Sequence, residues 1–157
     1  MSRSSSLFIS VSRVIAADAQ ALFDVLADPA QHPRIDGSGS LKEVQPDGPR
    51  RLSLGAKFGM NMHLGTKYRI LNSVVEFDEP RVIAWQHFNH HTWRYRFLPL
   101  ESVDGSPTGP KPRTEVTEEW DARRAKNRLL LRLLRFPRRN RAAMVATLRR
   151  LAELVER

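Results

Sequence analysis

Residues 58–87 decide the fold and read FGMNMHLGTKYRILNSVVEFDEPRVIAWQH. Apolar and polar side chains alternate through this stretch, a pattern typical of strands that pack on one side only. Gly65-Thr66 and residues 78–81 interrupt the alternation, which predicts tight turns between antiparallel neighbours. The stretch therefore predicts an antiparallel sheet with one apolar face and one charged face.

The alternation continues on both sides of this stretch, and it predicts further strands. We expect a first strand from Leu7, where apolar residues recur at every second position. The other expected strands cover residues 41–45, 51–53, 56–64, 67–77, 82–88, 93–100 and 114–120. Residues 102–113 are rich in Pro, Gly and Ser and are predicted to form a flexible loop.

Helices are predicted at both ends of this strand-rich region. Asp18 is a suitable N-cap for a helix that places Leu22 and Leu26 on one face. Pro29 begins a second, short helix, because proline is favoured at the first helical position. Residues 122–157 have helical spacing, with an apolar stripe that suits packing on the inner face of the sheet.

This order of elements resembles the helix-grip superfamily (START-like, SRPBCC), and in particular its polyketide cyclase/dehydrase-like bacterial members. The segments that carry the resemblance are VIAADAQALFDVLADPAQHPRIDGSG (14–39), residues 58–87 and TEVTEEWD (114–121). The resemblance implies an α+β helix-grip fold, in which a curved antiparallel sheet of about seven strands wraps around a long C-terminal helix. Two short helices follow the first strand, one domain covers residues 1–157, and residues 1–6 are expected to be disordered. Many such members have a tryptophan after the second proline of the short helix, where this chain has Arg34-Ile35-Asp36.

Members of the superfamily have a cavity between the sheet and the helix. The resemblance therefore implies that a set of inward side chains are candidate ligand-binding residues. By residue type alone this set would be ordinary core. The candidates are Phe58, Met60, Met62, Tyr68, Trp85, Trp93, Tyr95, Glu118, Asn140, Arg141, Met144 and Leu148. A buried Glu118 needs a partner, and Arg141 is the candidate partner, although Arg141 on a solvated helix face is an equal alternative.

Three polar residues are candidates for acid–base chemistry. His32 and Asp36 are four residues apart and would share a face if the short helix reaches that far. Tyr95 would join them from the sheet. The alternative is a helix that ends in solvated polar residues, and Pro33 favours that alternative.

The five histidines do not form a recognisable metal site. His87, His90 and His91 lie close together, but neighbouring residues of an extended strand point in opposite directions. The chain has no cysteine and no zinc-binding spacing. We therefore predict no metal site, and no motif indicates a cofactor.

The formal net charge of +9 belongs to the C-terminal segment. Residues 122–157 hold twelve Lys or Arg and two Glu, whereas the rest of the chain holds fourteen basic and fifteen acidic residues. No aromatic platform or helix-turn-helix pattern accompanies the arginines. We expect no sequence-specific binding to nucleic acid.

Two interpretations of residues 123–141 remain open. Arg128, Arg132, Arg135 and Arg139 have the spacing of one helix face, and Leu129, Leu130, Leu133 and Leu134 cover an adjoining face. In one interpretation the leucines pack on the sheet and the arginines are solvated. In the other, the segment is hinged at Pro137, covers the cavity entrance and transiently touches an anionic membrane through the arginines.

We expect a cytoplasmic protein, because the chain lacks cysteine, a signal-like stretch in Met1–Ser6 and any apolar run long enough to span a bilayer. The expected function is binding or transport of a small apolar molecule, such as a lipid, polyketide or aromatic metabolite. One alternative is a cyclase/dehydrase-type enzyme that uses the same cavity. A second alternative is a membrane- or polyanion-interacting protein that acts through its basic C-terminal segment. The oligomeric state is not indicated.

Overall fold

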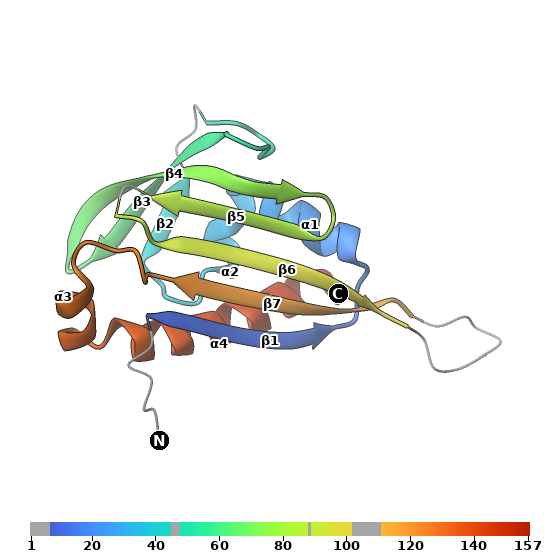
Figure 1. Cartoon of the computed structure of the whole chain (residues 1–157). Coiled ribbons are helices and arrows are strands. Elements are labelled where there is room, and N and C mark those ends of the chain that lie inside the picture. Colours follow the sequence, from blue (N-terminus) through green and yellow to red (C-terminus); the bar gives the residue numbers. More distant parts are fainter. Residues whose placement is uncertain (1–6, 45–47, 88, 102–110) are drawn as a thin grey trace, which may run out of the picture.

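The computed structural model describes residues 7–44, 48–87, 89–101 and 111–157. Its antiparallel strands form one seven-stranded sheet in the order β1-β7-β6-β5-β4-β3-β2 (Figure 1). The strands are β1 (Phe8–Ile15), β2 (Leu41–Val44), β3 (Lys57–Leu64), β4 (Thr66–Asp78), β5 (Val82–His87), β6 (Thr92–Leu100) and β7 (Arg113–Asp121). The first strand of the chain is therefore an edge strand beside the last one.

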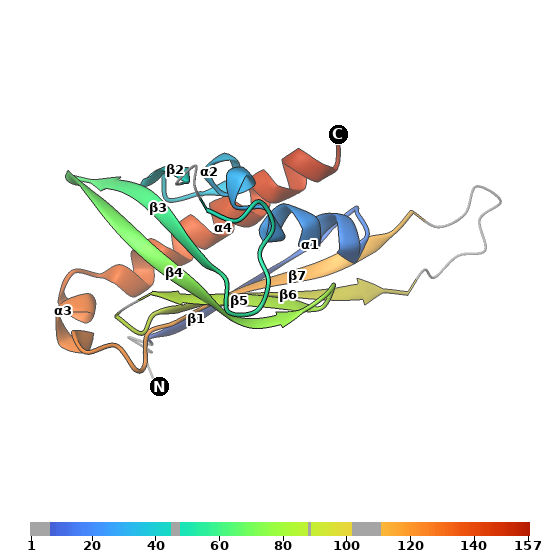
Figure 2. The ribbon, with the colours of Figure 1, turned by 90° about the horizontal axis from the view of Figure 1, so that it is seen from above.

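All helices except the short one at residues 128–133 lie on one side of this sheet (Figure 2). The helices are α1 (Ala19–Ala27), the 3₁₀ turn η1 (Pro29–Gln31), α2 (His32–Ile35), α3 (Arg128–Leu133) and α4 (Phe136–Val155). Figure 2 shows α4 crossing the inner face of the sheet, with α1 on the same side and β3 and β4 curving up beside α4. This arrangement confirms the α+β helix-grip fold.

Local signals place the first helices as the sequence predicts. The Asp18 carboxylate accepts a hydrogen bond from the backbone N–H of Ala21 at 2.7 Å and caps α1. The Asp28 carboxylate accepts one from Ala30 at 3.0 Å at the start of η1. Both expected short helices after the first strand are thus confirmed.

The core lies between α4, α1 and the inner face of the sheet. Met144, Thr147, Leu148, Leu151 and Ala152 are the buried residues of α4. The outer face of the sheet is charged instead: the Arg94 guanidinium on β6 lies 2.7 Å from a Glu76 oxygen on β4 and 3.0 Å from a Glu119 oxygen on β7. The one-sided sheet predicted from the alternation is confirmed.

One strand prediction needs correction, and one strand carries a bulge that the alternation did not indicate. Residues 51–53 form no strand, because Leu52 instead packs at the end of α1, where its N–H donates to the Ala27 carbonyl at 2.7 Å and its side chain is buried. A bulge between Val74 and Glu76 shifts the register of β4 against β5. The bulge exposes Val75 and lets Phe77 pack against the core.

The C-terminal segment is two helices and not one bent helix. α3 ends at Leu133 and α4 begins at Phe136, and Arg135 between them has the left-handed φ of 58°. Pro137 lies in the first turn of α4, a position that tolerates proline, so the break precedes it. The prediction that Arg128, Arg132, Arg135 and Arg139 line one helix is therefore wrong.

Some predictions fall on residues 1–6, 45–47, 88 and 102–110, which lie outside the described residues. They are the disordered N-terminus, the last residue of two expected strands and most of the expected 102–113 loop. Arg113, at the end of that loop, begins β7. No helix in the described part of the chain is long and apolar enough to cross a membrane.

Candidate functional site

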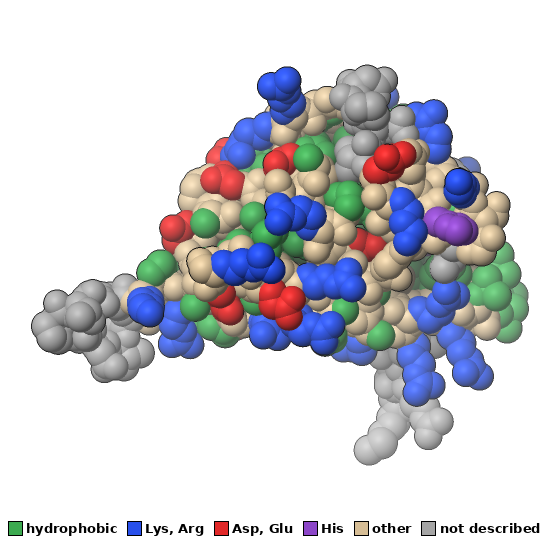
Figure 3. Space-filling view, turned by 180° about the vertical axis from the view of Figure 1, so that it is seen from behind, with side chains coloured by type: hydrophobic (Ala, Val, Ile, Leu, Met, Phe, Trp, Pro, Cys, Tyr) green, Lys and Arg blue, Asp and Glu red, His purple; other side chains and the backbone are tan. Residues whose placement is uncertain are grey.

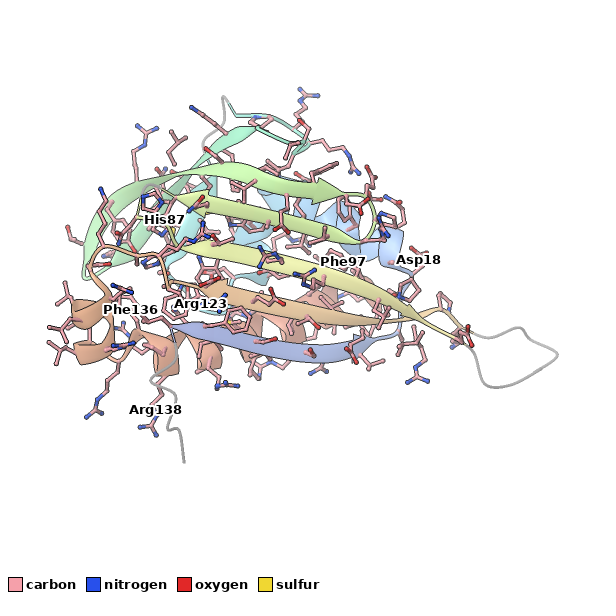
Figure 4. All side chains as sticks on the ribbon, in the orientation of Figure 1. Asp18, His87, Phe97, Arg123, Phe136 and Arg138 are labelled. Carbon is pink, nitrogen blue, oxygen red and sulfur yellow. The ribbon has the colours of Figure 1, made fainter. Side chains whose placement is uncertain are left out.

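A cavity of about 210 Å³ lies between the inner face of the sheet and α4. Strands β3 to β7 supply one wall, α4 supplies the opposite wall, and α2 with the loop after it forms the rim. The lining residues are Leu26, His32, Ile35, Asp36, Ser38, Ser40, Leu41, Met60, Met62, Tyr68, Ile70, Asn72, Trp85, His87, Trp93, Tyr95, Glu118, Phe136, Asn140, Ala143, Met144 and Thr147. Figure 4 shows two of them, His87 on the sheet and Phe136 at the start of α4, at the same end of the molecule.

Aromatic rings form a continuous part of the wall. The His32 and Trp85 rings stack with centroids 5.0 Å apart and planes 20° apart. Trp85 in turn lies 5.5 Å from the Tyr95 ring. Phe58 packs edge-on behind both His32 and Trp85. Such a wall offers broad, flat apolar surface to a ligand.

One carboxyl group is buried at this wall. The Glu118 side chain is 2% exposed, and the Tyr95 hydroxyl donates to its Oε1 at 2.8 Å. Its other oxygen, Oε2, is buried and has no hydrogen-bond partner among the described residues. Burial raises the pKa of Glu118 to about 8, and the negative charge of Asp36 adds to the rise. Glu118 therefore keeps its proton at neutral pH and can donate it to an acceptor in the cavity.

His32 presents a complementary group from α2. Its Nε2 lies 2.8 Å from the Leu26 carbonyl oxygen, which can only accept, so Nε2 carries the proton. Burial lowers the pKa of His32, and the ring is therefore neutral at pH 7. Nδ1 then bears a lone pair, and it is buried without a hydrogen-bond partner among the described residues. The cavity thus holds an acidic carboxyl group and a basic ring nitrogen.

The histidines at the end of β5 pack with one another. The His87 and His91 rings lie 4.6 Å apart, and burial lowers the pKa of both, that of His91 to about 4. His90 is exposed, and its backbone has a positive φ of 60°. Among the described residues no three His, Asp or Glu side chains are grouped so that they could hold a metal ion.

Comparison with known proteins gives this cavity a family context. The model of the family described as "Polyketide cyclase / dehydrase and lipid transport" matches residues 8–156. The chain belongs to this polyketide cyclase/dehydrase and lipid-transport family. Together with the fold, this membership supports binding of hydrophobic ligands in general.

The chain is also similar to a mycobacterial protein and to several solved structures. "Uncharacterized protein Rv0088" of Mycobacterium tuberculosis is 35% identical over 151 residues, which cover 92% of this chain but 62% of that protein, so the chain spans less than two thirds of this relative. A START superfamily protein from Mycobacterium smegmatis has a TM-score of 0.66 at 16% identity, over 95% of this chain and 97% of that one. Protein CV1439 from Chromobacterium violaceum has a TM-score of 0.68 at 14% identity, over 96% and 98%. These solved structures share the helix-grip fold.

The structure brings most of the predicted ligand-binding residues of this polyketide cyclase/dehydrase-like chain to one cavity. Those at the cavity are Met60, Met62, Tyr68, Trp85, Trp93, Tyr95, Glu118, Asn140 and Met144. Phe58 and Leu148 are buried in the core behind the cavity, each 1% exposed. Arg141 is exposed and does not reach Glu118, whose partner is Tyr95, so the predicted Glu118–Arg141 pair is wrong.

The three candidates for acid–base chemistry all line the cavity, but the hydrogen-bond partners of Asp36 are residues of the rim loop and not His32. Its carboxylate accepts hydrogen bonds from the Ser38 hydroxyl and from the backbone N–H of Leu41 at 2.9 Å, which orders the rim loop. The His32 ring contacts Leu26 and Trp85, and among the described residues no hydrogen bond joins this ring to the Asp36 carboxylate. The Arg34-Ile35-Asp36 segment contributes Ile35 and Asp36 to the cavity.

Sequence reasoning missed several lining residues for which a signal existed. Asn72 continues the two-residue period of Tyr68 and Ile70, and it is a buried polar residue. Phe136 and Thr147 continue the helical spacing of Asn140 and Met144. The rim residues Ser38 and Ser40 carried no such signal, because they lie in a loop.

Proposed function

We propose that the protein binds and carries a small, mostly apolar ring compound that has one polar group. The aromatic wall of His32, Trp85 and Tyr95 supports the ring compound over a flexible chain. The observation that carries the proposal is the pair of unsatisfied buried atoms, Glu118 Oε2 and His32 Nδ1, on the lining of the same apolar cavity. Buried polar atoms need partners, and a hydroxyl or carbonyl group of a ligand would supply one.

The cavity volume limits the ligand. About 210 Å³ is below the range of about 300–1,000 Å³ that is typical of sites for drug-sized ligands. Met60 and Met62 are flexible and can adapt the wall to different shapes. We expect an aromatic metabolite or a small polyketide to fit better than a two-chain lipid. The proposed location is the cytoplasm, which the absence of cysteine favours.

Equilibrium dialysis with 2-naphthol and naphthalene tests this function. Both probes share the rings that suit the apolar wall, and only 2-naphthol has a hydroxyl group for Glu118 or His32. We expect both to bind and 2-naphthol to bind about fivefold more tightly, since one hydrogen bond contributes about 1 kcal/mol. Equal affinities would contradict the polar role of the two buried atoms, and no binding of either probe would contradict the function itself.

A second candidate, an enzyme of the cyclase/dehydrase type, is favoured by the same pair of groups. A neutral Glu118 can protonate a carbonyl oxygen, and the Nδ1 lone pair of His32 can remove a proton from the adjacent carbon. The product is an enol, the nucleophile that a ring-closing condensation needs. No nucleophilic side chain has to form a covalent intermediate in this step.

Exchange of the acidic protons of 2-tetralone in D₂O, followed by NMR, separates the two candidates. An enzyme would accelerate the exchange beyond buffer alone, and both Glu118→Gln and His32→Phe would remove that acceleration. Loss of one acid–base group typically costs about a hundredfold or more in rate. A parent protein that binds 2-tetralone without accelerating exchange would be a carrier only.

A further inference from the structure

Four leucines of the α3 region are exposed instead of packing on the sheet. Leu129 and Leu133 are each 70% exposed, and Leu130 and Leu134 are each 50% exposed. The interpretation in which these leucines pack on the sheet is therefore wrong. We call these four residues the leucine patch. Monomeric proteins seldom expose large apolar side chains in a group, and such groups mark interaction sites.

The packing of Leu131 against the core determines which way the leucine patch faces. Leu131 is 3% exposed and packs in a small cluster with Trp120, Ala125 and Met144. Because Leu131 faces inward, the other leucines of this short helix face outward. The left-handed Arg135 then turns the chain into α4, so the helix cannot continue with its leucines along the sheet.

Basic side chains surround the patch. Residues 122–152 hold eleven Lys or Arg and no Asp or Glu. Arg124, Arg128, Arg132 and Arg138 are exposed, and none of them pairs with an acidic side chain in the described part of the chain. Figure 3 shows hydrophobic side chains gathered at one end of the molecule, with Lys and Arg beside them.

We propose that the leucine patch and its surrounding arginines dock the protein on an anionic lipid bilayer. A bilayer surface of this kind offers apolar chains for the leucines and negative headgroups for the arginines at once. A second copy of the chain fits less well, because joining two patches would bring two basic surroundings together. The surface adjoins the cavity, since Phe136, two residues after Leu134, is a lining residue. The docking does not depend on which compound the cavity binds.

Vesicle sedimentation tests the docking surface. The parent protein is expected to sediment with vesicles of phosphatidylcholine mixed with phosphatidylglycerol, to stay in solution with pure phosphatidylcholine, and to lose about tenfold in affinity at high salt. Leu129→Gln with Leu133→Gln should reduce sedimentation about tenfold or more, because the apolar part of the contact is lost. Arg128→Glu with Arg132→Glu should do the same.

The matched control is Leu54→Gln with Leu98→Gln, which changes two leucines that are 67% and 58% exposed elsewhere. This control should sediment like the parent. The proposal is overturned if the parent ignores mixed vesicles at low salt, or if the leucine variant sediments like the control. It is also overturned if the parent is a dimer that the leucine variant dissociates and neither form binds vesicles. Dialysis of 2-naphthol with the leucine variant is independent of these results and reports on the cavity alone.

Discussion

Replacing Glu118 by glutamine is expected to remove a large pH-dependent loss of folding stability. In the folded protein the pKa of Glu118 is about 8, because the carboxyl group is buried, whereas its ordinary value is 4.5. At a pH below 4.5 the Glu118 carboxyl group is protonated in both the folded and the unfolded state, so its burial does not make stability depend on pH. As the pH rises from about 5 to about 8, the unfolded state releases this proton and the folded state keeps it, so Glu118 lowers the free energy of unfolding by a total on the order of 4 kcal/mol.

Urea denaturation of the parent and of Glu118→Gln over this pH range measures the effect. Glutamine cannot ionise, but its side-chain oxygen can still accept the hydrogen bond from Tyr95. We expect the free energy of unfolding of the variant, relative to that of the parent, to increase steadily as the pH rises, by several kcal/mol in total. Tyr95→Phe is the companion variant, and it should retain the pH dependence because the carboxyl group remains. Parallel pH profiles for the parent and Glu118→Gln would show that this carboxyl group ionises in the fold as it does in water.

Gly37→Ala is expected to destabilise the fold severely. A Cβ atom at residue 37 would lie 2.2 Å from the Ala143 carbonyl oxygen and 2.5 Å from the Thr147 backbone nitrogen, both in α4. Backbone atoms of a helix cannot move aside as a side chain can, so the rim loop must leave α4. It would then lose the hydrogen bond from the Gly37 N–H to the Thr147 hydroxyl, which is 2.9 Å long. We expect a loss of at least about 3 kcal/mol in the free energy of unfolding.

Gly39→Ala, in the same loop, is the control. Gly39 has a φ of +69° and no atom within 4 Å of an added Cβ, so only the backbone conformation opposes alanine. That cost is about 1 kcal/mol. Thermal or urea denaturation should show that Gly37→Ala is clearly less stable than Gly39→Ala. A Gly37→Ala protein as stable as Gly39→Ala would contradict the close contact between the rim loop and α4.

The alternation of side chains in the sequence predicts most of the sheet, because a one-residue change of register would turn every apolar residue outward. For this reason the inward positions of Met60 and Tyr95 follow from the sequence. The break at Arg135 does not, because a left-handed conformation in a non-glycine residue leaves no mark in the pattern. Without that break, the leucines of α3 read as the inner face of a longer helix.

The partner of Glu118 depends on long-range register. Tyr95 and Glu118 are direct cross-strand neighbours on β6 and β7. The long connection between these strands leaves their pairing open, so the sequence alone offers Arg141, which carries the complementary charge, only as one candidate partner. The aromatic stack of His32 on Trp85 likewise joins α2 to the sheet, and it depends on contacts between residues far apart in the sequence.

Dialysis of 2-naphthol against a cavity-filling variant tests the central claim most directly. Met60 lies on the cavity wall and is 7% exposed, so Met60→Trp would place a larger side chain in the space for the ligand. Leu71→Trp makes a substitution of the same size on the outer face of the sheet, where Leu71 is 56% exposed. With circular dichroism showing both variants folded, we predict that Met60→Trp lowers the affinity about tenfold or more, whereas Leu71→Trp binds like the parent. Parent-like affinity of Met60→Trp would contradict the assignment of this cavity as the binding site.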